Sequence, residues 1–298
     1  RADAGGLQCR HVRAHGAAGS ETMNDEAVFL VDNGSLEPAA TLSLRRLASA
    51  LGERVEARVE PVSMRHSNRI AAEEIGGEPA ETFEEAFAAR AAAGVTRVTV
   101  VPMFFGPSGA ITSFLPDVAR QFPELEVRVC PALHREGDPR LAQIIAANVL
   151  GVAIGLGAST ALRPVALVDH GSPTRELTAV RDSLAAEIAA LLGDSFKVAP
   201  CSMERREGAQ YDFNQPLLAR LLATPPWNFG DVIVAMQFLH PGRHAGPGGD
   251  IATICRVAEA KAPGLRTHMT ALVGESPLLI DILADRLAAV GRVSDPPL

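Results

Sequence analysis

Two histidines follow apolar runs at positions where parallel α/β sheets carry out chemistry. His170 comes directly after the run PVALVD, and His244 follows the run VIVAMQFL within the glycine-rich segment HPGRHAGPGGD. Both runs have the length and composition of buried strands, so the two imidazoles are predicted at strand ends. Open α/β sheets bind ligands outside the carboxyl ends of their strands. The sequence therefore predicts a site at this edge of a sheet.

An open metal site is the chemistry that fits these residue types. The imidazoles of His170 and His244 suit divalent cobalt, iron, nickel or zinc, and Glu204, at the end of a third predicted strand, adds a nearby carboxylate. No thiolate belongs to the set, and this would leave the metal exchangeable. The four cysteines form no CxxC pair, so neither a structural zinc site nor a disulfide framework is indicated. His240 shares the loop of His244, and no role is assigned to it.

Other functions find no support in the chain. No GxGxxG motif follows the strand runs and DHGSPT is not a phosphate-binding loop, so no nucleotide is expected. A serine hydrolase would need a GxSxG motif, which is missing. The net charge of −7 gives no overall basic surface for nucleic acid or for an anionic membrane.

The chain repeats one pattern of strands and helices. Strand and helix signals alternate four times between residues 27 and 150, and the same order starts again at residue 164. The letters repeat as well: LVDNGS matches LVDHGS, and VVPMFFGPSGA matches IVAMQFLHPGRHA, at offsets of 133 to 140 residues. We therefore predict two tandem flavodoxin-like domains with parallel sheets, related by internal duplication, with a cleft between them.

The predicted boundaries follow this pattern. Residues 1–22 are expected to be a disordered leader, residues 23–150 the first domain, residues 151–163 a linker and residues 164–298 the second domain. The uncharged stretch 141–162 is expected to be a buried helix that runs into the linker, because its glycines and polar residues do not suit a membrane span. The chain is placed in the cytoplasm, or in the plastid stroma if residues 1–20 are the remnant of a transit peptide.

The two repeats can be compared with each other. The residues that align with His170, His244 and Glu204 in the first half are Asn33, Ala110 and Arg65. Framework residues such as Gly34 and Gly171 are shared between the halves, whereas the candidate ligands are not. We therefore expect the chemistry to belong to the second half and the site in the first half to be degenerate.

Three segments together resemble a known family. They are VDHGS at 168–172, CSMERREG at 201–208 with YDFNQPLL just after it, and FLHPGRHAGPGGDI at 238–251. The sequence resembles the class II tetrapyrrole metal chelatases, specifically the long two-domain sirohydrochlorin cobaltochelatases and ferrochelatases, over residues 27–290. This resemblance implies that His170 and His244 face each other across the cleft, bind the incoming metal and accept protons, with Glu204 as an orienting or relay carboxylate.

The resemblance also implies how the macrocycle is held. Sirohydrochlorin carries many carboxylates, which would be met by Arg205, Arg206 and Arg243, while Ser172 in the second half and Asn33, Ser35 and Ser108 in the first would contact the ring. Members of the family usually carry the histidine pair in the first half, whereas this chain carries it in the second.

The implied function is ATP-independent insertion of Co²⁺ or Fe²⁺ into sirohydrochlorin or a related tetrapyrrole, a lyase reaction of cobalamin or siroheme biosynthesis. In this reaction the metal is a substrate, and nickel or zinc could replace cobalt or iron. The alternative is a non-catalytic protein that binds tetrapyrrole or metal as a carrier, a sensor or a subunit of a larger complex. The expected state is a monomer or homodimer.

Overall fold

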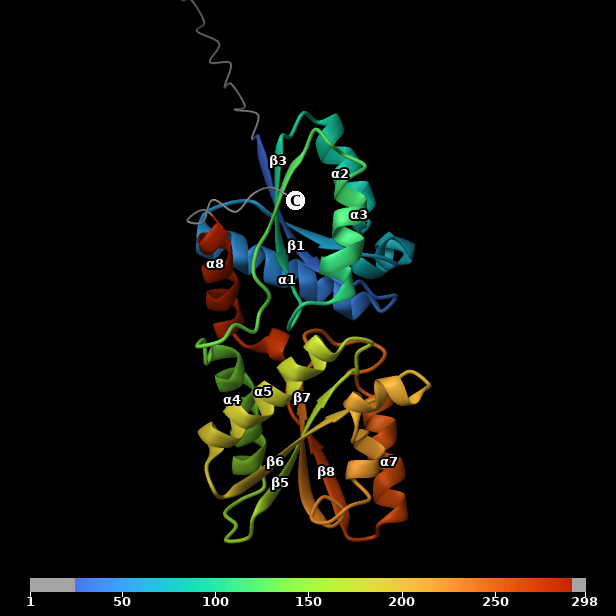
Figure 1. Ribbon diagram of the computed structural model, residues 1–298, viewed down its shortest axis with the longest axis vertical. Coiled ribbons are helices and arrows are strands. Elements are labelled where there is room, and N and C mark those ends of the chain that lie inside the picture. Colours follow the sequence, from blue (N-terminus) through green and yellow to red (C-terminus); the bar gives the residue numbers. More distant parts are fainter. Residues whose placement is uncertain (1–24, 291–298) are drawn as a thin grey trace, which may run out of the picture.

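Each half of the chain folds its apolar runs into a four-stranded parallel sheet (Figure 1). The computed structural model describes residues 25–290; the predicted leader lies outside the described residues. The strands of the first sheet, in spatial order β2-β1-β3-β4, are β1 (Glu26–Asp32), β2 (Val59–Ser63), β3 (Arg97–Pro102) and β4 (Glu126–Val129). Those of the second, in the order β6-β5-β7-β8, are β5 (Arg163–Asp169), β6 (Phe196–Ser202), β7 (Gly230–Met236) and β8 (Leu265–Met269).

The two sheets confirm the predicted duplication of an α/β domain. Their strand orders are equivalent, and their registers match residue by residue. Val31 pairs with Pro102 in the first sheet, and the equivalent Val168 pairs with Met236 in the second. At the offset that relates β3 to β7, His244 in the loop after β7 corresponds to Ala110 after β3.

Helices cover both faces of each sheet. In the first half they are α1 (Pro38–Val55), α2 (Phe83–Ala92), α3 (Leu115–Ala119) and α4 (Arg140–Gly155), with a π-helical turn η3 (Ala110–Phe114) before α3. In the second half they are α5 (Arg175–Leu192), α6 (Leu218–Leu221), α7 (Asp250–Lys261) and α8 (Leu278–Val290). Short 3₁₀ turns complete the set: η1 (Ser67–Arg69), η2 (Ala72–Ile75), η4 (Ala209–Asn214) and η5 (Val273–Glu275).

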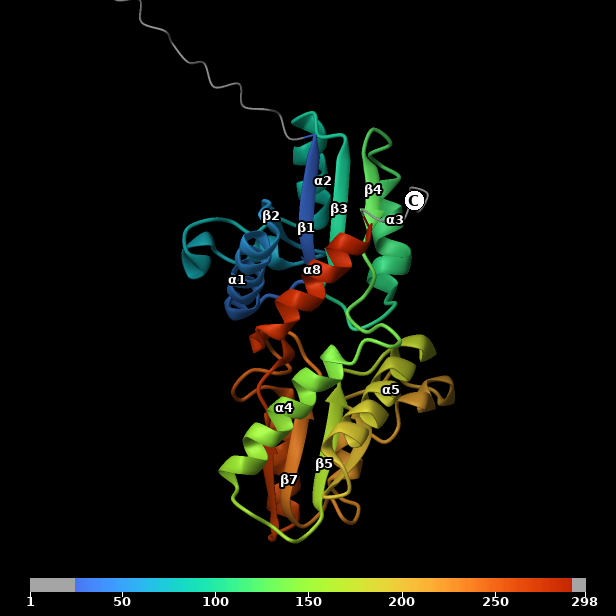
Figure 2. The same cartoon turned by 90° about the vertical axis from the view of Figure 1, so that its left-hand side faces the viewer.

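The last helix of each half packs on the sheet of the other half. Helix α4 lies beside α5 on the second sheet, and α8 lies beside α1 on the first (Figures 1 and 2). Helix α4 continues to Gly155, which includes the first residues of the predicted linker 151–163. Because α4 already packs on the second sheet, the chain passes between the domains before α4, in the segment that follows β4. Each spatial domain therefore contains a helix from both halves of the sequence.

This exchange produces one continuous core through both domains. The apolar side chains of α1 and α8 on the first sheet and those of α4 and α5 on the second belong to a single buried cluster, for example Leu47, Ile282, Ile145 and Ile188. Two further clusters lie on the outer faces, one under α2 and α3 and the other under α6 and α7. Burial of apolar surface in the shared cluster fixes the domains relative to each other.

The apolar stretch 141–162 begins as the buried helix predicted. Ile144, Ile145 and Val149 of α4 are almost fully enclosed in the shared cluster. Within residues 25–290, none of the helices combines the length and the hydrophobicity needed to cross a bilayer.

A buried arginine also joins the halves. Arg286 of α8 is 2% exposed, and it donates hydrogen bonds to the carbonyl oxygens of Ala132 and Leu133 at 3.0 and 2.8 Å and to the Asp138 carboxylate at 2.8 Å. These partners lie in the segment between β4 and α4. The guanidinium therefore holds the point where the chain leaves the first domain.

We predict that Arg286→Met lowers the free energy of unfolding by about 3 kcal/mol, because the methionine fills the space but leaves the carbonyl oxygens of Ala132 and Leu133 without this donor. The half-buried carboxylate of Asp138 also loses one of its two arginine partners and keeps only Arg140. Chemical denaturation followed by circular dichroism measures this change.

The matched control is Arg54→Met, which removes an exposed ion pair between α1 and α8. Arg54 and Asp281 are 57% and 49% exposed, so less than about 0.5 kcal/mol should be lost. Equal losses in the two variants would contradict the assignment of Arg286 as the anchor.

Candidate metal centre between the domains

The first loop of each repeat turns at a glycine that no other residue can replace without strain. Gly34 and Gly171 have φ values of +82° and +96°, in the left-handed region. A Cβ atom would lie 1.8 Å from the carbonyl oxygen of Arg65 in the first case and 2.0 Å from that of Glu204 in the second. Each glycine is thus packed against a backbone carbonyl group, and the two carbonyl groups occupy equivalent positions in the two repeats. The residue before each glycine lies at the carboxyl edge of its sheet.

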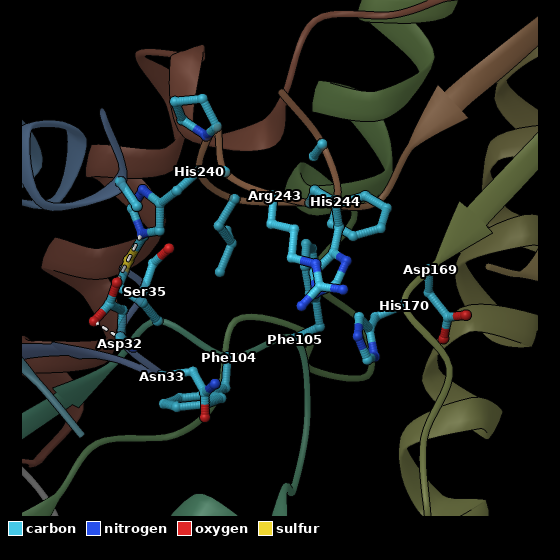
Figure 3. A pocket seen from close by; sticks show the side chains of 18 of the residues that line it. Asp32, Asn33, Ser35, Phe104, Phe105, Asp169, His170, His240, Arg243 and His244 are labelled. Carbon is cyan, nitrogen blue, oxygen red and sulfur yellow. Dashed lines mark hydrogen bonds and ion pairs between the residues drawn. The ribbon is translucent and has the colours of Figure 1, made fainter. Parts of the chain in front are cut away.

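In the second repeat that residue is His170, and its imidazole meets that of His244. The two ring centroids are 4.7 Å apart with the planes at 70°, and the side chains are 47% and 34% exposed (Figure 3). The structure therefore brings together the two histidines that the sequence singles out, on adjacent strands of one sheet. They are accessible enough for a hydrated metal ion to reach them.

Asp250, which the sequence analysis missed, orients one of these imidazoles. Its Oδ2 lies 2.7 Å from Nδ1 of His244, so Nδ1 carries the proton and Nε2 is left free as a ligand. Metal-binding histidines commonly have such a carboxylate partner. The sequence did contain a signal for Asp250, because an acidic residue begins the helix that follows the glycine-rich loop of His244.

Glu204 lies close to the histidines but is not part of a preformed cluster. Its Oε1 is 3.5 Å from Nε2 of His170, and the side chain is 61% exposed. Among residues 25–290, no group of three or more His, Cys, Asp or Glu side chains is arranged to hold a metal ion. Two imidazoles would leave most coordination positions to water and to an incoming ligand, an arrangement that suits a metal in transit.

Next to the imidazole pair, a cavity of about 550 Å³ opens between the carboxyl edges of the two sheets. Its walls come from both domains, and much of its lining is apolar: Leu36, Met103, Phe104, Phe105, Leu177, Phe238 and Leu239. Figure 3 shows His170, His244 and Arg243 on one side of the cavity and His240 with Asp32 and Ser35 on the other. The cavity could therefore take a flat apolar ligand with one face toward the histidines.

Four of the residues predicted to contact a macrocycle line this cavity: Asn33, Ser35, Ser108 and Arg243. Arg243 is 79% exposed and lies 3.8 Å from Asp250, so its guanidinium is available to an anionic ligand. The hydroxyl oxygen of Ser108 is buried and has no hydrogen-bond partner in the structure.

The other predicted contact residues are engaged elsewhere and do not line the cavity. Ser172 is buried, and its hydroxyl oxygen accepts the backbone N–H of Thr174 at 3.0 Å, at the start of α5. Arg205 donates to the carbonyl oxygens of Arg206 and Gly208 at 3.0 and 2.9 Å. The Arg206 guanidinium lies 5.9 Å from the ring centroid of Tyr211. Contact of these three side chains with a macrocycle would require rearrangement.

A buried acid–base pair on the opposite side of the cavity was also missed. Oδ2 of Asp32 and Nε2 of His240 are 3.9 Å apart, and the two side chains are only 8% and 10% exposed. Burial raises the pKa of Asp32 to about 6, and burial together with the charge of Arg46 lowers the pKa of His240 to about 4. The sequence placed His240 in the loop but gave no sign of its partner, because the two residues come from different domains.

The comparisons with known proteins agree with this architecture. Residues 27–150 match the CbiX family model. No curated protein matches the sequence.

Three solved structures show the same fold over most of the chain. SirB from Bacillus subtilis with Fe³⁺ is 14% identical, with a TM-score of 0.63, over 89% of this chain and 95% of that one. The sirohydrochlorin chelatase SirB from B. subtilis subspecies spizizenii in complex with cobalt is 16% identical, with a TM-score of 0.62, over 90% and 95%. CbiX, the terminal enzyme of siroheme biosynthesis in denitrifying bacteria, is 16% identical, with a TM-score of 0.59, over 89% and 98%.

The two-domain fold that the resemblance to the class II chelatases implies is thereby confirmed. Residues 27–150 match the CbiX family model, and the chain as a whole shares the fold of these solved chelatases. The family-model match covers the repeat that carries Asn33 and Ala110 in place of the histidines.

We predict that Asp250→Asn weakens binding of Co²⁺ about tenfold, because an amide can present its N–H to Nδ1 and favour the wrong tautomer of His244. Isothermal titration with CoCl₂ measures the affinity.

The control is Asp231→Asn, which alters another histidine–carboxylate pair, with His268 at 2.8 Å, outside the cavity. The Co²⁺ affinity of this variant should equal that of the wild type. An unchanged Co²⁺ affinity in Asp250→Asn would show that Asp250 does not orient His244 for metal binding.

We also predict that Asp32→Asn stabilises the protein in a pH-dependent way. Because the folded-state pKa of Asp32, about 6, lies above the ordinary value of 3.8 for an aspartate, its contribution to stability is complete below about pH 4 and is lost as the pH rises through 6. The asparagine has no ionised form to bury. The variant should therefore exceed the wild type by up to about 3 kcal/mol above pH 7 and by little at pH 4.

Urea unfolding at several pH values between 4 and 8 tests this prediction. A stability difference that does not grow with pH would show that the carboxyl of Asp32 is not held in its neutral form by burial.

Proposed function

We propose that this protein inserts a divalent metal, Co²⁺ or Fe²⁺, into sirohydrochlorin or a related tetrapyrrole without a nucleotide. The observation that carries the proposal is the pair of accessible imidazoles, His170 and His244, at the edge of an apolar cavity between two chelatase-like domains. We further propose that the protein is a monomer or homodimer. We place it in the cytoplasm, or in the plastid stroma if residues 1–20 are the remnant of a transit peptide.

The roles follow from the geometry. Two ring nitrogens would bind the metal: Nε2 of His244 and one nitrogen of His170. Asp250 keeps Nε2 of His244 free for this role by its hydrogen bond with Nδ1. The remaining positions on the metal would be filled by water, which the pyrrole nitrogens replace one after another. Glu204 is close enough to His170 to orient it or to take up a proton from it.

The macrocycle would lie in the apolar cavity, where the side chains of Phe104, Phe105 and Leu239 offer flat contact area. Arg243 is the cation at the cavity edge that can meet a carboxylate of the ring. Asn33 and Ser35 would contact the ring from the first domain.

The similar solved structures support this choice of reaction. SirB is a sirohydrochlorin chelatase seen with cobalt and with Fe³⁺, and CbiX acts at the end of siroheme synthesis. Imidazole and carboxylate ligands discriminate poorly among first-row divalent ions, so nickel and zinc are further candidate substrates.

A non-catalytic role is the second candidate. It is favoured by one observation: the half that matches the CbiX model has no histidine at either equivalent position. Such a protein would bind the tetrapyrrole or the metal without joining them, as a carrier, a sensor or a subunit of a larger complex.

We predict that the purified protein converts sirohydrochlorin to its metal complex with Co²⁺ or Fe²⁺ under anaerobic conditions in the absence of ATP. His170→Ala and His244→Ala should each slow the reaction at least about a hundredfold, because one imidazole cannot hold the hydrated metal in place. The change in the absorption spectrum of the macrocycle gives the rate.

His66→Asn serves as the control, because His66 is an exposed histidine outside the cavity lining, and asparagine tolerates its φ of 73°. This variant should react at the wild-type rate. Tight tetrapyrrole binding with no metal insertion by the wild type, for any of the four metals, would favour the non-catalytic role instead.

A further inference from the structure

His240 stands in the cavity with one ring nitrogen satisfied and the other unpaired. Its Nδ1 lies 3.1 Å from the hydroxyl oxygen of Ser43 on α1. Its Nε2 is buried and has no hydrogen-bond partner, and the nearest acidic group is Asp32, 3.9 Å away. A buried polar atom without a partner is costly, so its presence on a cavity wall calls for an explanation.

The duplication provides an internal control for this position. The loop after β7 brings His240 against Ser43 of α1 in the first domain. In the equivalent contact, the loop after β3 brings Gly106 against Val180 of α5 in the second domain. A Cβ on Gly106 would lie 2.7 Å from the Val180 side chain, so the contact is close and apolar. Packing of the two domains therefore needs no polar group here, and the histidine is not explained by the fold.

The acid beside His240 differs from its counterpart in the same way. Asp169 in the second repeat is compensated by the nearby positive charge of Arg181, a fully buried residue of α5. The equivalent position on α1 is the apolar Leu44. Asp32 thus lacks a buried arginine, and the group that faces it from across the domain boundary is His240.

We propose that His240, supported by Asp32, is a catalytic residue that accepts a pyrrole proton from the macrocycle during metal insertion. This inference rests on the proposed function and adds a second centre to the same cavity. His170 and His244 hold the metal at one side, while His240 and Asp32 lie at the other (Figure 3).

The reaction balances with this assignment. Four metal–nitrogen bonds form and two pyrrole N–H bonds break; the electron pair of each broken N–H bond stays on its nitrogen, which donates it to the metal. Nε2 of His240 is enclosed and faces Asp32, so the imidazole has to turn toward the ring to accept one proton. The carboxylate of Asp32 stabilises the resulting imidazolium, and the other proton leaves through His170 or water. Two positive charges enter with the metal and two leave as protons, with no change of oxidation state.

The test compares His240→Asn with wild-type protein in the insertion assay with sirohydrochlorin and Co²⁺. Asparagine keeps a polar group near Ser43 but removes the acceptor at the Nε2 position. The turnover number should fall about a hundredfold, whereas the KM for sirohydrochlorin and the affinity for Co²⁺ should stay within about threefold. Asp32→Asn should lose about tenfold in turnover number by the same reasoning.

The control is His268→Asn, which breaks a histidine–carboxylate pair at the opposite end of the second sheet and should leave all three constants unchanged. Wild-type turnover in His240→Asn would overturn the proposal. So would a parallel loss of Co²⁺ affinity, because that would make His240 a metal ligand.

A second measurement does not depend on turnover. In ¹⁵N-histidine-labelled protein without metal, addition of sirohydrochlorin should shift the Nε2 resonance of His240, and addition of the diamagnetic ion Zn²⁺ alone should not. If wild-type protein inserts no metal but the resonance shifts, the proposed function fails while the contact of His240 with the ring stands. If insertion proceeds and the resonance does not move, the inference fails and the proposed function stands.

Discussion

Helix α4 follows the first sheet in the chain but packs on the second, and helix α8 follows the second sheet but packs on the first. Because the apolar faces of these helices belong to one buried cluster, neither domain completes its core alone. The exchange and the buried Arg286 fix the distance between the two sheets, whose carboxyl edges face each other (Figure 2). The cavity exists because this packing holds the edges apart while closing the sides, and every contact proposed for the macrocycle depends on it.

The duplicated fold supplies two equivalent sites, and the residues at them have diverged. The second repeat presents His170 and His244, whereas the first presents Asn33 and Ala110 on the same backbone framework. The loop after β7 also carries His240 to the first domain, where it meets Asp32. The two candidate metal ligands therefore both come from the second half, while Asp32 and His240 come from different halves.

The fold, and the proximity of the two candidate metal-binding histidines, could be predicted from the sequence because both depend on local patterns. Apolar runs of strand length mark β5 and β7, and histidines directly after them must lie at the same sheet edge. The exchange of α4 and α8 could not be predicted, since an apolar helix gives no sign of which sheet it covers. Arg205, Arg206 and Ser172 were chosen by their place in a motif, but local hydrogen bonds and stacking engage them outside the cavity. The pairing of Asp32 with His240 depends on contacts between distant segments.

The central claim is that a divalent metal is held between His170 and His244 and reaches the cavity from there. The most direct measurement is anomalous diffraction at the cobalt edge from crystals of the protein soaked in CoCl₂. The account predicts one anomalous peak about 2.1 Å from a ring nitrogen of each of these two histidines, with Asp250 still bonded to His244. A peak beside His240 and Asp32 instead, or no ordered cobalt at a concentration that supports turnover, would contradict it.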